Sequence, residues 1–301
     1  MQDILKGLND KQYEAVVNTE GPCLVIAGAG SGKTKVLTHK IAYLIGEKQV
    51  LPWNILAITF TNKAANEMKE RIANLVGDVA KDIWMGTFHS ICVRILRRFI
   101  DRIGFDSSFI IFDTSDQRTL VKACVKSIGL DDKMFTDRSV LSEISNAKNE
   151  MLDPEQYTVR ANGDFRKEKI ALVYEMYQKR LKENNAIDFD DIINYTIKIL
   201  MDNPDILEYY SDKFKYVLVD EYQDTSPLVI EILLEFIQQR KKKNIIGFFG
   251  DAMQSIYEAG IGDIDSYIES RVVYKVEKKQ NRRNPQTVID IANTIRTDGL
   301  V

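Results

Sequence analysis

The sequence predicts an α/β fold in which a parallel sheet, doubly wound with helices, is interrupted by a mostly helical insertion. Short apolar runs rich in β-branched residues alternate with amphipathic segments of helix length at the start of the chain. This alternation is typical of parallel strands joined by crossover helices. The strand rhythm stops in a long charged middle section. It then returns as continuous apolar runs, which indicate strands buried on both faces.

The first hundred residues are expected to hold three strands and three helices. Each strand is a short apolar run, and each is followed by a segment with apolar residues at helical spacing. The expected strands are Cys23–Ala27, Ile55–Phe60 and Ile83–Met85, and the expected helices are Lys33–Ile45, Asn62–Val76 and Phe88–Arg102.

The middle section, about residues 101–186, is expected to form a separate helical insertion. Helical spacing is visible in Gln117–Ser127 and Ala171–Glu183. The pairs Asp153-Pro154 and Asn162-Gly163 are typical of loops.

The strand pattern returns near the end of the chain. Tyr216–Val219 and Ile245–Phe249 are expected to be buried strands, and Val272–Val276 is a further candidate. Pro285 suits the first turn of a helix over Gln286–Ile295, because its missing N–H costs nothing there.

Composition excludes several classes of protein. The sequence holds two histidines, and its three cysteines are scattered, so neither a zinc site nor a disulfide framework is expected. No apolar run approaches the roughly 20 residues of a membrane-spanning helix. No secretory signal opens the sequence, so we expect a cytoplasmic protein without a membrane partner. The net charge of −3 is not that of a strongly basic nucleic-acid-binding domain, so any phosphate contacts must come from local clusters.

The most specific motif is a glycine-rich loop between the first expected strand and helix. Such a loop lets backbone N–H groups surround a phosphate at a helix N-terminus. Lys33 is expected to reach the β- and γ-phosphates of ATP, and the Thr34 hydroxyl to bind Mg²⁺. The alternative is a glycine-rich turn that binds nothing. The loop residues are Ala27, Gly28, Ala29, Gly30, Ser31, Gly32, Lys33 and Thr34, with Ala27 where the usual pattern has glycine.

A second candidate feature is the acidic end of the strand Tyr216–Val219. Asp220 is expected to bind Mg²⁺ and Glu221 to act as general base toward the attacking water. Two adjacent carboxylates could also be an ordinary solvated turn. Asp220 lies far from Lys33 in the sequence, and an insertion between two halves of one sheet accounts for this separation.

Read together, these motifs resemble those of the UvrD/Rep/PcrA-type helicases of superfamily one. The resemblance covers nearly all of the chain apart from its middle, and its motifs occur in the family's order. The matching segments are Leu8–Gln12 (LNDKQ), Ala27–Thr34 (AGAGSGKT), Thr59–Ala65 (TFTNKAA), Gly86–Ser90 (GTFHS), Asp188–Asp191 (DFDD), Asp220–Thr225 (DEYQDT), Gly250–Tyr257 (GDAMQSIY) and Gln280–Arg283 (QNRR).

The resemblance implies a RecA-like P-loop domain that binds ATP and Mg²⁺ and moves along single-stranded DNA in the 3′→5′ direction, toward a duplex junction. By this resemblance Gln12 would bind adenine, Gln254 would sense the γ-phosphate, and Arg283 would act as an arginine finger. Asp188–Asp191 would mark the return from the insertion. The residues implied in DNA binding are Thr59, Phe60, Thr61, Asn62, His89 and Tyr257.

Three features depart from the family's pattern. Ala259 and Gly260 stand where a stacking tryptophan and an arginine are usual, which weakens the expected DNA grip. Lys35 and Arg282 stand where an arginine and a tyrosine usually sandwich adenine. The sequence also stops soon after QNRR, where the family begins its second RecA-like domain.

We therefore expect a first RecA-like ATPase domain over 1–100 and 187–281, a helical insertion over 101–186, and the start of a truncated second RecA-like domain over 282–301. The expected function is that of the ATP-binding half of a DNA helicase or single-stranded DNA translocase. The alternatives are a nucleotide-regulated DNA-binding or scaffold module whose motor coupling has decayed, and the motor half of a helicase–nuclease.

Overall fold

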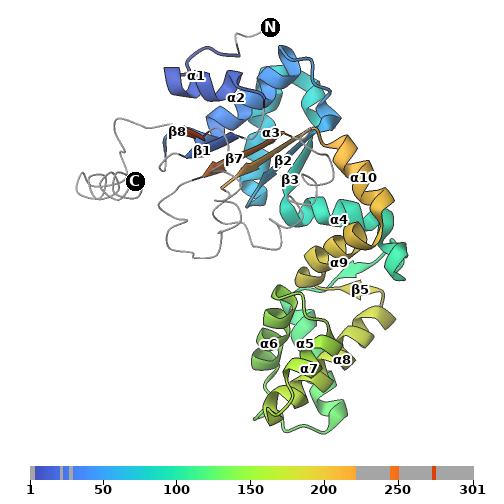
Figure 1. Ribbon diagram of the computed structural model, residues 1–301. Helices are drawn as coiled ribbons and strands as arrows, with labels where there is room; N and C mark the ends of the chain where they lie inside the picture. Colours follow the sequence, from blue (N-terminus) through green and yellow to red (C-terminus); the bar gives the residue numbers. More distant parts are fainter. Residues whose placement is uncertain (1–3, 21–22, 27–29, 222–244, 251–272, 276–301) are drawn as a thin grey trace, which may run out of the picture. The chain divides into compact units, whose positions relative to one another are not determined.

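The computed structural model describes residues 4–20, 23–26, 30–221, 245–250 and 273–275 (Figure 1). The chain divides into two compact units. The first comprises Met1–Ile91 and Leu207–Val301, and the second comprises Cys92–Ile206. Several expected site residues lie outside the described residues: Ala27, Gly28, Ala29, Gln254, Tyr257, Ala259, Gly260, Arg282 and Arg283.

The first unit is built on a six-stranded sheet with the strand order β3-β2-β6-β7-β1-β8. All neighbouring strands are parallel. The predicted α/β class with a parallel sheet is therefore confirmed. The strands are β1 (Cys23–Ile26), β2 (Ile55–Thr59), β3 (Trp84–Thr87), β6 (Tyr216–Asp220), β7 (Ile245–Gly250) and β8 (Val273–Lys275).

The core of the first unit lies between one face of this sheet and the helices α1 (Asp10–Val17), α2 (Lys33–Gly46) and α3 (Asn62–Val76). Val36, Leu37 and Ile41 of α2 are fully buried there against strand residues that include Ala57 and Leu218. Leu56, Val217 and Val219 are buried on alternate positions of the same strands. Strand side chains alternate between faces. The central strands are therefore buried on both sides, as their continuous apolar runs predicted.

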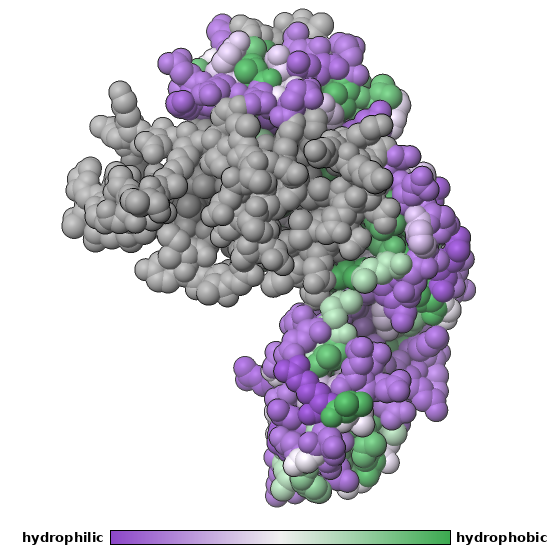
Figure 2. All heavy atoms as spheres, in the orientation of Figure 1, coloured by the Kyte–Doolittle hydropathy of each residue, from purple (hydrophilic) through white to green (hydrophobic). Residues whose placement is uncertain are grey.

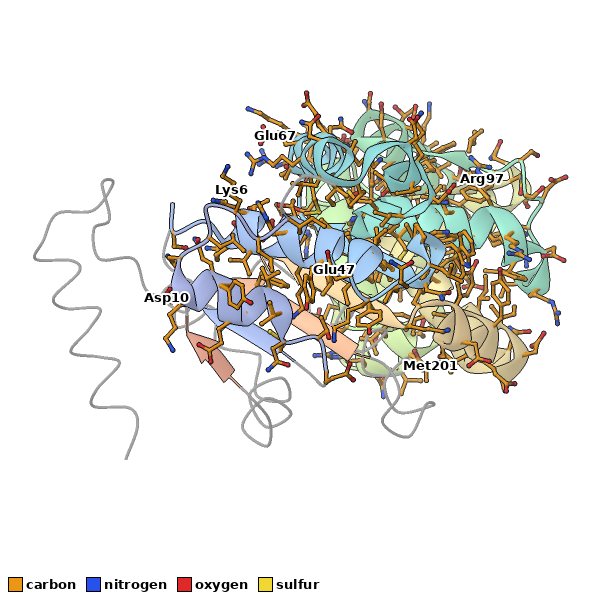
Figure 3. The ribbon with its side chains drawn as sticks, turned by 90° about the horizontal axis from the view of Figure 1, so that it is seen from above. Lys6, Asp10, Glu47, Glu67, Arg97 and Met201 are labelled. Carbon is orange, nitrogen blue, oxygen red and sulfur yellow. The ribbon has the colours of Figure 1, made fainter. Side chains whose placement is uncertain are left out.

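A further helix, α10, also packs against this sheet. Trp84 of β3 packs edge-on against Tyr210 of α10 (Pro204–Lys213) and against Phe214, which follows this helix, with ring centroids 5.9 and 5.2 Å apart. Trp84 pairs with Leu56, whose side chain lies on the face away from α2 and α3. Short 3₁₀ turns, η1 (Pro52–Asn54) and η2 (Gly77–Asp82), lead into β2 and β3. Figure 3 shows the helices from above, with Glu67 of α3 labelled.

The second unit is mostly helical, as predicted. It also contains a small parallel sheet that we did not anticipate, formed by β4 (Ile110–Ile111) and β5 (Ala186–Ile187). The part of this unit's surface seen in Figure 2 is mainly hydrophilic. Its helices are α5 (Thr114–Ile128), α6 (Asp137–Asn149), α7 (Pro154–Arg160), α8 (Phe165–Glu183) and α9 (Phe189–Asp202), with the 3₁₀ turn η3 (Ile100–Ile103), and α4 (Phe88–Phe99) leads into them.

The unit is wider than the expected 101–186. The side chain of Lys148 on α6 binds Asp188 and Asp191 at the start of α9, which places α9 in this unit instead of the sheet unit. The Asp153-Pro154 pair, expected in a loop, begins α7: Asp153 accepts a hydrogen bond from the Gln156 N–H and Pro154 occupies the first turn.

Two expectations from composition can be compared with the structure. Cys23, Cys92 and Cys124 are free and buried. Within the described ranges, no helix combines the length and the apolar character that crossing a membrane requires.

Candidate functional site

The glycine-rich loop meets α2 in a conformation that requires glycine. Gly30 and Gly32 have positive φ angles of 72° and 93°, in the left-handed region that residues with a Cβ rarely adopt. A Cβ on Gly32 would also lie 2.9 Å from Nε2 of Gln12. Gly32 is the N-cap of α2 and has no side chain to satisfy the first N–H groups of the helix. These groups therefore suit an anionic ligand.

The structure brings together the four side chains that were expected to converge. Lys33 and Thr34 are the first two residues of α2, while Asp220 ends β6 and Glu221 follows it. The Thr34 hydroxyl donates a hydrogen bond to Asp220 Oδ2 over 3.3 Å. Lys33 Nζ lies 3.7 Å from Glu221 Oε2. A loop and a strand end that are distant in sequence thus form one polar site.

Asp220 has the properties of a cation ligand. Its Oδ1 atom is buried and has no hydrogen-bond partner among the described residues. Burial raises the pKa of Asp220 to about 6, and the neighbouring Glu221 carboxylate adds to this rise. Hydrogen bonding from Thr34 and the charge of Lys33 act in the opposite direction. A carboxylate and a hydroxyl oxygen are the hard ligands that Mg²⁺ prefers, so these two residues fit this ion.

Glu221 is held differently from Asp220. Its φ angle of 53° is unusual for a residue other than glycine, and it marks a sharp turn directly after β6. The side chain is about one-third exposed, at 36%. Glu221 is therefore accessible to water, while Asp220 points into the protein.

Gln12 connects α1 to the glycine-rich loop. Its Oε1 atom accepts a hydrogen bond from the Asn9 N–H at 3.1 Å, and its Nε2 donates to the Ser31 carbonyl at 3.1 Å. A glutamine amide has two N–H donors and two lone pairs on its oxygen. One donor and one lone pair of Gln12 therefore remain for a ligand.

Two lysines of α2 hold the segment that carries Gln12. Lys35 Nζ donates to the Gly7 carbonyl at 2.6 Å. Lys40 is fully buried and donates to the carbonyls of Ala15, at 2.9 Å, and of Asn18. Sequence analysis missed Lys40. Its signal was a lysine on the apolar face of α2, between Leu37 and Ile41.

The residues expected to bind DNA after β2 have unlike environments. Phe60 is 63% exposed, and Asn62 is exposed as well. The Thr61 hydroxyl caps α3 by accepting from the Ala64 N–H at 3.1 Å. Thr59 is buried, at 2% exposure. Of these four residues, Phe60, Thr61 and Asn62 are exposed and therefore accessible to a nucleic acid, and Thr59 is not.

The second expected DNA segment begins where β3 meets α4. His89 is exposed in the first turn of α4. Gly86, three residues before it, lies close to Ser90: a Cβ on Gly86 would lie 2.2 Å from Ser90 Oγ, so a larger residue would force the Ser90 side chain to shift. The Ser90 hydroxyl in turn donates to the Thr87 carbonyl at 2.7 Å. The turn that presents His89 is therefore tightly constrained.

The Asp188–Asp191 segment is a buried polar cluster of the second unit. Lys148 Nζ donates to Asp188 at 2.6 Å and to Asp191 at 2.7 Å, and all three residues are buried. The Tyr177 hydroxyl also donates to Asp188 at 2.9 Å. Burial and the Asp188 carboxylate raise the pKa of Asp191 to about 7. The cluster satisfies its own hydrogen bonds and is structural.

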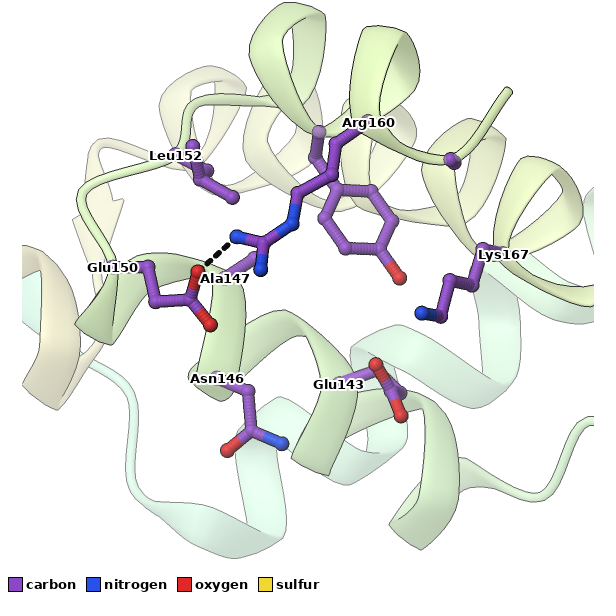
Figure 4. A pocket seen from close by; sticks show the side chains of 9 residues that line it. Glu143, Asn146, Ala147, Glu150, Leu152, Arg160 and Lys167 are labelled. Atoms are coloured by element: carbon purple, nitrogen blue, oxygen red, sulfur yellow. Dashed lines mark hydrogen bonds and ion pairs between the residues drawn. The ribbon is translucent and has the colours of Figure 1, made fainter. Parts of the chain in front are cut away.

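A pocket of about 140 Å³ lies in the second unit (Figure 4). Arg160 pairs with Glu150 in its lining, and Lys167 and Glu143 add a second pair of opposite charges. Balanced charges and a volume well below the roughly 300 Å³ of small ligand pockets do not suit a nucleotide. In the described part of the chain, no three His, Cys, Asp or Glu side chains gather as a metal cluster.

Comparison with known proteins identifies the family of this chain. Residues 8–274 match the family described as UvrD/REP helicase N-terminal domain. The chain is 47% identical over 296 residues to the ATP-dependent DNA helicase PcrA of Bacillus subtilis, covering 97% of this chain and 40% of that protein. It is 48% identical over 299 residues to PcrA of Staphylococcus epidermidis, covering 98% of this chain and 40% of that protein. The chain thus spans about 40% of the length of the curated relatives it matches.

Proposed function

Because the chain belongs to the UvrD/REP helicase family, we propose that it is the nucleotide-binding part of an ATP-dependent DNA helicase. The observation that carries this proposal is the convergence of Lys33 and Thr34 with Asp220 and Glu221. ATP hydrolysis needs a phosphate-binding loop, a cation ligand and a base at one place, and these four residues supply them.

The four residues have different roles in the proposed reaction. Lys33 would bind the β- and γ-phosphates, and the N–H groups at the start of α2 would bind their oxygens. Thr34 and Asp220 would hold Mg²⁺, which neutralises charge on the phosphates. Glu221, being reachable by water, would accept a proton from the attacking water. By resemblance, Gln254 and Arg283 would complete the site.

Gln12 would select adenine. Its remaining N–H and lone pair match the N7 acceptor and the N6 amino donor of adenine, the pairing that glutamine makes with this base. Guanine offers two acceptors on the same edge and would leave the lone pair of Gln12 unpaired. This selection does not depend on a tyrosine–arginine sandwich, which Lys35 and Arg282 cannot form.

We propose single-stranded DNA, at its junction with a duplex, as the nucleic-acid partner. Phe60 would stack on an unpaired base, and Asn62 and His89 would contact the strand beside it. By resemblance, Thr61 and Tyr257 belong to the same surface, whereas the side chain of Thr59 is buried. Movement, also by resemblance, is in the 3′→5′ direction. Translocation requires a second RecA-like domain, which residues 282–301 would begin.

The test is the ATPase rate of the full-length protein, which would include the second RecA-like domain proposed above, with and without single-stranded DNA. Wild-type protein should show stimulation by DNA. Lys33→Ala should lose ATP binding, whereas Glu221→Gln should bind ATP and lose about 10²–10⁴-fold in rate, the usual contribution of a general base. A nucleotide-regulated scaffold would bind ATP without stimulation by DNA, and that result would reject the motor. The isolated 301 residues should bind Mg²⁺-ATP weakly and unwind nothing.

A further inference from the structure

Thr59 and Asp220 occupy equivalent positions at the ends of neighbouring strands. β2 and β6 are parallel, and their last paired residues are Ile58 and Val219. The next residue of each strand is Thr59 and Asp220, respectively. Two positions earlier, Ala57 and Leu218 both face the core under α2 and α3. Because side chains two residues apart share a face, Thr59 and Asp220 point to the side from which Thr34 of α2 approaches.

Both side chains carry a buried oxygen without a partner. Thr59 Oγ1 and Asp220 Oδ1 make no hydrogen bond among the described residues. Thr59 is 2% exposed and Asp220 3%. Buried polar groups in native proteins are almost always hydrogen-bonded, so an unpartnered pair on adjacent strands calls for an explanation. Neighbouring strands are about 4.8 Å apart, which is close to the span of one water bonded to both groups.

We propose that Thr59 is a positioning residue of the nucleotide site: its hydroxyl holds a water against Asp220 Oδ1, in the outer shell of the cation that Thr34 and Asp220 would bind. The inference rests on the proposed function and deepens it. It assigns Thr59 to the nucleotide side of β2, instead of to the DNA contact that its neighbours suggest. The Thr59 side chain is buried and therefore not accessible to DNA, whereas Phe60, the next residue, is exposed.

The position of Thr59 also connects two parts of the molecule. A change at Asp220 on nucleotide binding reaches Thr59 through this water, and Phe60 through a single peptide bond. Thr61 then anchors α3 through its cap. Residues 59–61 thereby join the cation side of the site to the surface proposed for DNA.

The experiment uses the full chain and the variants Thr59→Val and Thr59→Ser. Valine keeps the shape of threonine and removes the hydroxyl, while serine keeps the hydroxyl. Affinity for a fluorescent ATP analogue is measured with Mg²⁺ and with EDTA, and melting temperature is measured without nucleotide. Thr196→Val is the matched control, because Thr196 is equally buried but its hydroxyl donates to the Ile192 carbonyl at 2.7 Å.

Thr59→Val should weaken binding about 10-fold in Mg²⁺, the lower end of the effect of removing an outer-shell partner, and leave binding in EDTA unchanged. Its melting temperature without nucleotide should change little, because the hydroxyl loses only its hydrogen bond to a water. Thr59→Ser should restore Mg²⁺-dependent binding. Thr196→Val should behave oppositely, with a lower melting temperature and normal binding.

The inference is overturned if Thr59→Val binds the analogue like wild type in Mg²⁺, or if it weakens binding equally in EDTA. The second result would mean that the hydroxyl does not act through the cation. Thr34→Val separates this failure from that of the proposed function. If wild type shows Mg²⁺-dependent binding and Thr34→Val abolishes it, a normal Thr59→Val rejects the water at Thr59 alone. If wild type shows no such binding, both are rejected.

Discussion

Replacing Lys40 with methionine tests whether the buried ammonium group positions α1, and with it Gln12. Methionine fills nearly the same volume without charge, so no large cavity forms. What disappears is the pair of hydrogen bonds from Nζ to the carbonyls of Ala15 and Asn18. These carbonyls lie at the C-terminal end of α1, where a cation also interacts favourably with the helix dipole.

The expected loss of stability follows from these contacts. A hydrogen bond from a charged donor is worth about 1.5–3 kcal/mol, so the two bonds together contribute about 3–6 kcal/mol. Burial of the ammonium offsets part of this, and the same burial lowers the pKa of Lys40 below its ordinary value. A net loss of about 2 kcal/mol corresponds to a fall of about 4–8 °C in melting temperature for a unit of this size.

The functional consequence should appear in nucleotide choice. Gln12 lies one turn before Ala15 on α1, so a loosened helix end lets its amide move relative to Ser31 and the base. Lys40→Met should reduce the preference for ATP over GTP about 10-fold, equivalent to about 1.4 kcal/mol. The assay is competition of ATP and GTP for one fluorescent analogue, combined with urea denaturation followed by circular dichroism.

Lys148→Met is the matched control. It removes the second unit's buried lysine, leaves two carboxylates unpaired and should cost about 3–5 kcal/mol. It should leave the ATP-to-GTP preference unchanged. If Lys40→Met keeps the wild-type preference while losing stability, Lys40 is structural only. If it changes neither property, the two hydrogen bonds contribute nothing and the reasoning fails.

Three further predictions concern single side chains. Gln12→Glu replaces the donating amide with a carboxylate, so the preference for ATP over GTP should disappear in the same competition assay; a retained preference would place adenine recognition elsewhere. Phe60→Ala should weaken single-stranded DNA binding by about 1–3 kcal/mol per stacked base, measured by fluorescence anisotropy, at an unchanged melting temperature because the ring is exposed. Asp191→Asn tests the buried cluster. Because the folded-state pKa of Asp191 is raised from 3.8 to about 7, its contribution to stability is present at low pH and is lost as pH rises through this window. The free energy of unfolding of wild type should therefore fall relative to that of the variant as pH rises from about 4 to 7, measured by urea denaturation. A difference in unfolding free energy that stays constant over this range would contradict the raised pKa.

Local pattern was sufficient for the sheet and its loop. The apolar runs over β2 and β6 predicted strands buried on both faces. A half-exposed strand would have polar residues at alternate positions, and these runs have none. Gly30, Gly32, Lys33 and Thr34 were recognisable because phosphate binding demands a specific backbone conformation and specific donors. The Asp153-Pro154 pair was misread as a loop, since the same two residues can also begin a helix.

Long-range hydrogen bonds could not be predicted in this way. The Lys148 cluster extended the second unit through α9, and the contact between Gln12 and Ser31 joined α1 to the loop. Each depends on side chains brought together by several helices. A sequence pattern predicts which face of a helix or strand is apolar, but it does not predict which other helix or strand packs against that face.

The amino-acid sequence by itself determined the parallel α/β fold with a mostly helical part in its middle and pointed to a phosphate-binding loop, because strand burial and the glycine-rich pattern are properties of contiguous residues. Only the tertiary structure decided what each residue near the site can touch. Thr59 and Phe60 are adjacent in one motif, yet Thr59 ends β2 and is buried, whereas Phe60 follows the strand and is exposed to solvent.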